Sequence, residues 1–269
     1  MKLSIVLSTQ PAQFQAATFK GDLEANLKQI ASLGYDGVEL AIRDPKLIDL
    51  EKLDGLVRNH SLHVPAIGTG QAWGEEGLSF TDPDPEIRSA AIERVKSHIP
   101  VASHFGAVII IGLVRGIVKP GVEHSQVMDW LVEALRECSA AARPYDIRLA
   151  LEPINRYETT LINNSSEGLD LIERVGAENF GLLLDTFHMN IEEADIETSI
   201  RSCGERIFHF HVADSNRWYP GAGHLDFASI LAELNATGYL DWVSGEFIPK
   251  PDASTSAKES IAYLRAIKV

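Results

Sequence analysis

Residues 180–214 read FGLLLDTFHMNIEEADIETSIRSCGERIFHFHVAD. This stretch contains two strand-like apolar runs joined by an amphipathic segment. The first run ends on Asp185, and the second carries His211 close to its end. A strand, a helix and a second strand in this order are typical of neighbouring parallel strands. Because parallel neighbours end at the same edge of a sheet, we expect Asp185 and His211 to open onto one rim.

The same strand–helix unit repeats along the whole chain. The amphipathic segments that follow the runs cover 22–33, 47–60, 85–104, 124–142, 166–175, 192–203, 226–237 and 255–267. The runs themselves are KLSIVL (2–7), GVELAI (37–42), HVPAIG (63–68), AVIIIG (107–112), RLALEP (148–153), FGLLLD (180–185), IFHFHVAD (207–214) and DWVSGEF (241–247).

Eight such units predict an α/β fold of the (β/α)₈ TIM-barrel type, with the active site at the carboxyl ends of the strands. A doubly wound open sheet is the alternative, and it fits less well because no glycine-rich phosphate loop follows the first run. No linker or composition shift divides the sequence, so we expect one catalytic domain over residues 1–269. The connection 68–85 is interpreted as a lid or rim loop.

Local signals place some of the helix ends. Gly34 is expected to close the first helix, Asp84 with Pro85 to start the third, and Ser165 or Ser166 to cap the fifth.

Bulk properties narrow the class of protein. The chain has 269 residues and a net charge of −14, which disfavours binding to nucleic-acid phosphates. The start MKLSIVLST does not resemble a signal peptide, and no apolar stretch is long enough for a membrane span. We therefore expect a cytoplasmic protein with no nucleic-acid or membrane partner, whose Cys138 and Cys203 are reduced and buried.

Four potential metal ligands close four successive runs. Their spacing is 26 to 35 residues, and they are Glu152, Asp185, His211 and Glu246. Three carboxylates and one imidazole suit a hard or borderline divalent cation, so we predict Mn²⁺, with Co²⁺ or Mg²⁺ as alternatives. A structural zinc site would more often use thiolates, and none lie nearby. His209, two residues before His211, is interpreted as a hydrogen-bonded barrel histidine rather than as a fifth ligand.

The two glutamates of this set also suggest a reaction. A cation that binds a ketone oxygen and a neighbouring hydroxyl acidifies the carbon between them and stabilises the enediolate. Glu152 and Glu246 on opposite faces of that carbon would remove and return its proton, which inverts the carbon. A single carboxylate acting between C1 and C2 would instead interconvert an aldose and a ketose. Polar residues after these strands, among them Asn155, Arg156 and Asp214, are interpreted either as substrate contacts or as a rim network.

At these residues the chain resembles the xylose-isomerase-like TIM-barrel superfamily of sugar isomerases and epimerases. It is most similar to the ketose 3-epimerases that act on D-tagatose and D-psicose. The motifs that carry the resemblance are LEPINRYET, LLLDTFHMNIEE, FHFHVADSNRWYPGAGH and SGEF.

The resemblance implies an isomerase that inverts C3 of a keto-sugar or keto-sugar acid through a metal-stabilised cis-enediolate. It implies a metal site of Glu152, Asp185, His211 and Glu246, with Glu152 and Glu246 as the catalytic pair. By the same resemblance Glu158, His188 and Arg217 hold the O1–O2 end of the substrate. A homodimer or homotetramer is also implied.

The front half of the chain departs from the free-ketohexose enzymes. Its segments AIGTGQAWGEEGLSF (66–80) and IIIGLVRG (109–116) look more like a branch with acidic substrates, such as 5-keto-L-gluconate epimerase. Arg115 is therefore expected either to pair with a substrate carboxylate or to bridge rim carboxylates. Gln71 and Trp73 are expected to close over the sugar, although Trp73 also fits a role in sealing the barrel top.

Two other activities belong to the same superfamily. A hydroxypyruvate isomerase or another aldose–ketose isomerase would use the same metal site, and the set Glu158, His188 and Arg217 favours the epimerase over it. A DNA-repair endonuclease would need more histidines for a zinc cluster and a basic surface, which a net charge of −14 does not supply. A non-catalytic sugar-binding protein would not need two carboxylates across one carbon.

Overall fold

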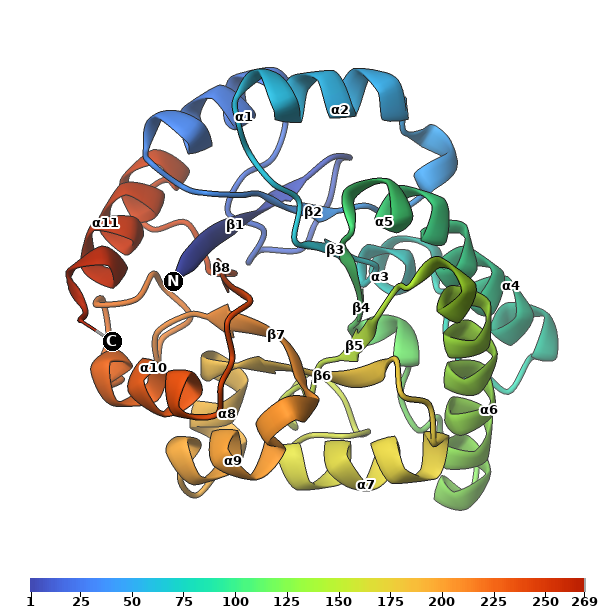
Figure 1. Ribbon diagram of the computed structural model, residues 1–269. Coiled ribbons are helices and arrows are strands. Elements are labelled where there is room, and N and C mark those ends of the chain that lie inside the picture. Colours follow the sequence, from blue (N-terminus) through green and yellow to red (C-terminus); the bar gives the residue numbers. More distant parts are fainter. Residues whose placement is uncertain (269) are drawn as a thin grey trace.

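Eight parallel strands close into a barrel in sequence order, and the last strand pairs back to the first (Figure 1). The computed structural model describes residues 1–268. The predicted TIM barrel is confirmed. The strands are β1 (Lys2–Ser8), β2 (Glu39–Ala41), β3 (Ala66–Gly68), β4 (Val108–Ile111), β5 (Leu149–Leu151), β6 (Phe180–Asp185), β7 (Ile207–Val212) and β8 (Trp242–Gly245).

Helices form an outer ring around the barrel (Figure 1). They are α1 (Leu23–Ser32), α2 (Leu50–Asn59), α3 (Gln71–Glu76), α4 (Pro85–Ser97), α5 (Ile99–Phe105), α6 (His124–Ala142), α7 (Ser165–Val175), α8 (Thr186–Glu192), α9 (Ile196–Cys203), α10 (Phe227–Ala236) and α11 (Ala253–Ala266). Single 3₁₀ turns lie at η1 (Pro45–Leu47), η2 (Leu113–Arg115), η3 (Arg143–Tyr145) and η4 (Gly204–Arg206).

The apolar core has two layers because successive strand residues point to opposite faces of the sheet. The larger layer lies between the strands and the helices and includes Leu3, Leu40 and Leu182. The smaller cluster is formed by alternate residues of the strands: Ala66, Val108, Ile110, Ala150, Leu183 and Phe208. On β5 and β6 the residues in step with Ala150 and Leu183 therefore face the barrel axis, where the site is built. On β7 the pairing with β6 is irregular, and His209 and His211 rather than Phe210 take this face.

Two of the predicted helices differ from the observed ones. The segment 85–104 is two helices, α4 and α5, which meet at His98. Pro100 lies in the first turn of α5, where its missing N–H is tolerated, but it could not continue α4. The segment 192–203 begins later, at Ile196, because Asp195 caps α9.

Helix caps and short helices give further corrections. Asn164, and not Ser165 or Ser166, caps α7 by accepting a hydrogen bond from the backbone N–H of Glu167 at 2.9 Å. The expected cap at Asp84 is confirmed. The connection 68–85 contains the short helix α3, and a second short helix, α8, follows β6 directly. Neither short helix was expected, because seven residues or fewer show little helical periodicity.

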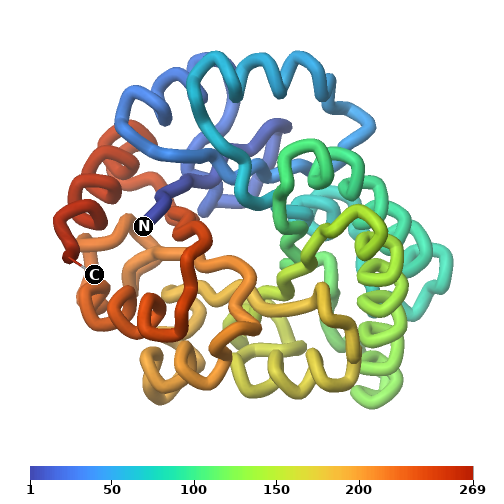
Figure 2. The backbone as a smooth tube through the Cα atoms, in the orientation of Figure 1, coloured from blue at the N-terminus to red at the C-terminus, as the bar shows by residue number. Residues whose placement is uncertain are grey.

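The start of the chain lies beside its last helix, α11 (Figure 2). Arg265 of α11 donates a hydrogen bond from Nη1 to the carbonyl oxygen of Met1 at 2.9 Å, and it also pairs with Asp36. Cys138 and Cys203 are free and buried, as expected. Over residues 1–268, none of the helices combines the length and the apolar character that a membrane crossing requires.

Two glycines provide a matched test of the packing below the barrel. A Cβ added at Gly37 would lie 2.7 Å from the Trp242 ring and 2.8 Å from the carbonyl oxygen of His63, whereas one added at Gly55 in α2 would meet nothing within 4 Å. Gly37→Ala should lower the free energy of unfolding by about 1–3 kcal/mol. Gly55→Ala should raise it by roughly 0.5–1 kcal/mol. Urea unfolding measures both changes, and equal effects of the two substitutions would contradict this packing.

Candidate active site

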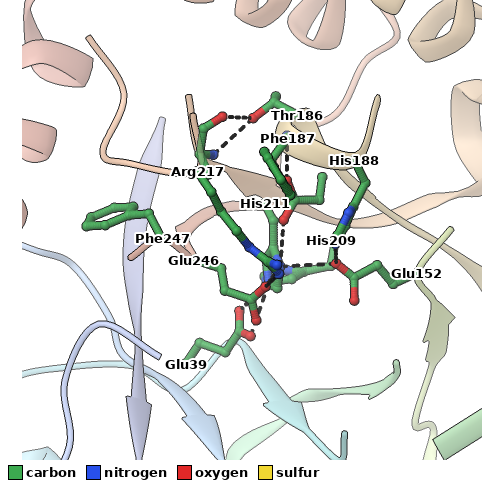
Figure 3. Close-up of polar contacts among 12 residues, drawn as sticks. Glu39, Glu152, Thr186, Phe187, His188, His209, His211, Arg217, Glu246 and Phe247 are labelled. Carbon is green, nitrogen blue, oxygen red and sulfur yellow. Dashed lines mark hydrogen bonds and ion pairs between the residues drawn. The ribbon is translucent and has the colours of Figure 1, made fainter. Parts of the chain in front are cut away.

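Four side chains from neighbouring strand ends converge at the top of the barrel. The Nδ1 atom of His211 lies 3.8 Å from Asp185 Oδ2, 3.8 Å from Glu246 Oε2 and 3.9 Å from Glu152 Oε1. One donor atom from each of the four residues lies within 4.8 Å of the other three. Glu152 and Glu246 approach the His211 ring from opposite sides in Figure 3. The structure therefore brings together the four residues that the sequence singled out.

This cluster has the properties of a cation site. Glu152 Oε1, Asp185 Oδ2 and His211 Nδ1 are buried and have no hydrogen-bond partner within residues 1–268. Buried polar atoms normally find a partner, and leaving them without one is costly. Three carboxylates and an imidazole nitrogen that face one point fit a divalent cation of the hard or borderline class.

The protonation behaviour of the cluster agrees with this fit. Burial, together with the neighbouring Glu246 carboxylate, raises the pKa of Glu152 well above its usual value. Burial also raises the pKa of Asp185 and brings that of Glu246 to about 7. Burial alone would lower the pKa of His211, but the Glu39 and Glu246 carboxylates outweigh it and raise the value to about 10. Without a cation, the cluster therefore retains protons that a metal would displace.

Glu39 orients His211 from below. Its carboxylate accepts hydrogen bonds from Nε2 of His211 at 2.9 Å and from Nε2 of His209 at 2.8 Å, and all three side chains are buried (Figure 3). A carboxylate that accepts from one ring nitrogen leaves the other nitrogen free to bind a metal. Glu39 was not among the predicted site residues, although a glutamate inside the apolar run GVELAI was a visible signal. The prediction that His209 is a hydrogen-bonded barrel residue is confirmed.

Asn155 fixes both the orientation and the tautomer of His188. Its Nδ2 donates to His188 Nδ1 at 2.7 Å and to Glu158 Oε1 at 2.9 Å. Since Nδ1 accepts, the proton of a neutral ring sits on Nε2, which lies 3.6 Å from Glu152 Oε1. Burial lowers the pKa of His188 well below its usual value, so the ring is neutral and presents an N–H donor toward the cluster.

Arg217 reaches the same space from the loop after β7. Its Nη1 donates to Glu158 Oε1 at 2.8 Å, and its Nη2 lies 3.9 Å from Glu246 Oε2. The guanidinium also packs over the Phe187 ring, with 4.9 Å to the ring centre. Arg217 has φ = 60°, a conformation that costs energy in a residue other than glycine and is often found at functional sites.

A cavity of about 320 Å³ opens beside the four converging residues. It is of the size of a small-molecule site. One part of its wall contains Glu152, Ile154, Glu158, His188, Arg217 and Glu246. The rest is supplied by segments near β1 to β4: Gln13, Phe14, Ala41, Gly68, Gly70, Gln71, Trp73, Gly74, Glu75, Ile110, Gly112 and Leu113.

Arg115 does not reach this cavity wall. Its side chain is fully buried behind the wall, and its Nη1 donates to the carbonyl oxygen of Ile162 at 3.3 Å. Burial lowers the pKa of Arg115 to about 10, an effect that the charges of Glu152 and Glu158 oppose. The guanidinium thus remains a cation behind the carboxylates, with no carboxylate within 4.0 Å over residues 1–268.

Two other rim residues have structural partners. Arg156 pairs with Glu192 at 2.7 Å, in agreement with the rim-network interpretation. Asp214 is buried and accepts backbone N–H groups of Ser215, Gly221 and Leu225, so it holds the loop that carries Arg217.

Known proteins resemble the chain over nearly its full length. The family model described as "Xylose isomerase-like TIM barrel" matches residues 27–267. An L-ribulose 3-epimerase of Mesorhizobium japonicum is 31% identical over 235 residues, covering 87% of this chain and 78% of the relative. A D-psicose 3-epimerase of Enterocloster bolteae is 40% identical over 225 residues, covering 81% and 74%. A crystal structure of D-allulose 3-epimerase from Methylomonas sp. with D-allulose superposes with a TM-score of 0.84 at 25% identity, covering 100% and 97%.

Glu39→Gln tests the orienting contact below the cluster. The amide keeps the shape of the side chain but loses the charge that holds two imidazole N–H groups, so Mn²⁺ affinity should fall about 10- to 100-fold. Titration calorimetry on the purified protein measures this change without any substrate. Glu137→Gln, at an exposed site of α6, is the matched control and should bind as the wild type does. An unchanged affinity in Glu39→Gln would rule out the orienting role.

Metal affinity should rise with pH between 6 and 8. The pKa of Glu246 is about 7 because of its burial, and a protonated carboxyl cannot serve as a ligand. Raising the pH through 7 removes this competing proton, so Mn²⁺ should raise the melting temperature more at pH 8 than at pH 6. Calorimetry in buffers of different ionisation enthalpy should also detect released protons. A pH-independent affinity would contradict the account.

Proposed function

The chain belongs to the xylose isomerase-like TIM barrel family, and from this premise we propose that it is a metal-dependent epimerase that inverts C3 of a keto-sugar. Relatives at 31% and 40% identity are an L-ribulose 3-epimerase and a D-psicose 3-epimerase, which supports a carbohydrate epimerase. The similarity to a D-allulose 3-epimerase in complex with its sugar supports a small keto-sugar as substrate.

The observation that carries the proposal is the pair of carboxylates at the end of β5 and after β8. Glu152 and Glu246 lie on opposite sides of the His211 ring, and both side chains line the cavity (Figure 3). An epimerisation needs one base to remove the proton of C3 and an acid on the other face to return it. Burial brings the pKa of Glu246 to about 7, which suits a group that both takes and gives a proton near neutral pH.

Three residues beside the four-residue cluster, His188, Arg217 and Glu158, suit the carbonyl end of a ketose. Neutral His188 presents its Nε2–H to a carbonyl oxygen, and Arg217 adds a positive charge beside it. Glu158, held by Asn155 and Arg217, offers a carboxylate oxygen to the O1 hydroxyl. Together these contacts orient C3 between the two glutamates. Holding a substrate in the reactive orientation lowers the activation free energy of the reaction.

The four-residue cluster would hold the cation. When bound, a divalent metal would polarise the substrate carbonyl and stabilise negative charge on its oxygens. We propose Mn²⁺ because three carboxylates and one imidazole favour hard or borderline ions, and Co²⁺ or Mg²⁺ satisfy the same preference. We also propose that residues 1–269 act as one catalytic domain. A homodimer or homotetramer and a cytoplasmic location stay predictions.

Replacement of either glutamate tests the two-base proposal. Glu152→Gln and Glu246→Gln keep an oxygen ligand but cannot transfer the proton, so each should lower kcat for C3 epimerisation by roughly 10²- to 10⁴-fold. The assay follows D-allulose with saturating Mn²⁺, and metal content is measured in each variant. Glu178→Gln, at an exposed site, is the control. Near wild-type kcat in either metal-loaded variant would rule out the two-glutamate mechanism.

A further inference from the structure

The side of the cavity that faces away from the carbonyl-binding residues comes from the first strands of the barrel. In a closed barrel ordered β1 to β8, strands β2 and β3 lie across from β6 and β7. Glu158, His188 and Arg217 follow β5, β6 and β7. If the proposed function holds, a ketose gripped at O1 and O2 extends C4 to C6 toward β2 and β3, and the chemistry of that wall selects the distal half of the sugar.

Gln71 is the buried polar side chain in this part of the wall. It begins α3 directly after β3 and is only 6% exposed. Its Nε2 donates to Ser8 Oγ at 2.8 Å. Its Oε1 is shielded from solvent and has no hydrogen-bond partner anywhere in residues 1–268. A buried acceptor in this state costs free energy until a donor reaches it.

Ser8 determines which end of the Gln71 amide is left over. The Ser8 hydroxyl, at the end of β1, donates its only hydrogen to the carbonyl oxygen of Gln10 at 2.6 Å. Ser8 Oγ can then only accept, so the atom that faces it must be the amide nitrogen. A reversed amide would set two acceptors against each other. The unpartnered atom is therefore an oxygen, which accepts hydrogen bonds and donates none.

The charges of this wall favour the same kind of ligand. Of the cavity-lining residues between positions 13 and 113, all of which the structure describes, none is a lysine, arginine or histidine. The wall does contain the carboxylate of Glu75, which accepts a hydrogen bond from the backbone N–H of Gln13 at 2.8 Å. Arg115 lies outside the wall. A carboxylate at the far end of the substrate would thus meet acceptor oxygens and no cation, at a cost in binding.

We propose that Gln71 is a specificity-determining residue that accepts a hydrogen bond from a hydroxyl on C4, C5 or C6 of the substrate, with Ser8 as its positioning residue. The cavity then favours keto-sugars with a neutral polyol tail. A 5-keto-hexonate has the same carbonyl end as a ketohexose but a carboxylate at the far end, and it is disfavoured. This outcome differs from the acidic substrate that the front-half segments suggested.

The test compares the effect of a Gln71 substitution on D-allulose with its effect on analogues that each lack one hydroxyl. In Gln71→Met the side chain keeps its length and loses its strong acceptor, so kcat/KM for D-allulose should fall about tenfold. With one of the 4-, 5- and 6-deoxy analogues, wild type and variant should agree within about twofold, because the partner hydroxyl is absent. Ser8→Ala should show the same analogue dependence in weaker form, which a loss of packing alone would not produce. Gln126→Met, on the exposed face of α6, is the matched control and should match the wild type on every substrate.

Contrary results separate this inference from the function it rests on. An equal loss in Gln71→Met on D-allulose and on all three deoxy analogues would overturn the hydroxyl contact while leaving the epimerase intact. Equal or better kcat/KM of the wild type for a 5-keto-hexonate than for the matching ketohexose would overturn the preference for a neutral tail. If the wild-type enzyme exchanges no C3 proton of any ketose, the proposed function itself fails, and this inference fails with it.

Discussion

Three carboxylates that meet inside a protein need a compensating positive charge, and this requirement organises the top of the barrel. Glu152, Asp185 and Glu246 are held together by their strands, whereas burial, and to a smaller extent neighbouring carboxylates, raise the pKa of each. Two sources of positive charge are built into the fold, namely Arg217 beside the cluster and Arg115 behind it. A bound divalent cation would supply the rest, while Glu39 holds the His211 ring in place from below.

The two sides of the barrel rim contribute different kinds of residue to the cavity. The loops after β5 to β7 carry the charged and hydrogen-bonding groups, and the segments after β1 to β4 supply a mostly apolar wall. Asn155 and Asp214 do not line the cavity, but they fix His188 and the loop of Arg217. Such supporting contacts keep a site in its productive geometry. In this protein the choice of sugar is then expected to depend on the wall near Gln71.

The sequence predicted the barrel and the four-residue cluster because both follow from a simple period. Each strand ends at the same rim, so a ligand-type residue at each strand end needs no knowledge of distant contacts. Contacts between residues far apart in the sequence could not be predicted from this period. Glu39 bonds to His211 across 172 positions, and Gln71 bonds to Ser8 across 63. The placement of Arg115 could not be predicted from its position after β4 either, because its side chain is fully buried and lies outside the lining of the cavity.

The central claim is that two carboxylates move a proton at C3 of a ketose. The most direct measurement is NMR of D-allulose incubated with the Mn²⁺-loaded wild-type protein in D₂O. The account predicts deuterium at C3 of the sugar together with formation of the C3 epimer, and no label at C1. Deuterium at C1 with formation of an aldose would instead identify an aldose–ketose isomerase, and it would contradict the role assigned to Glu152 and Glu246.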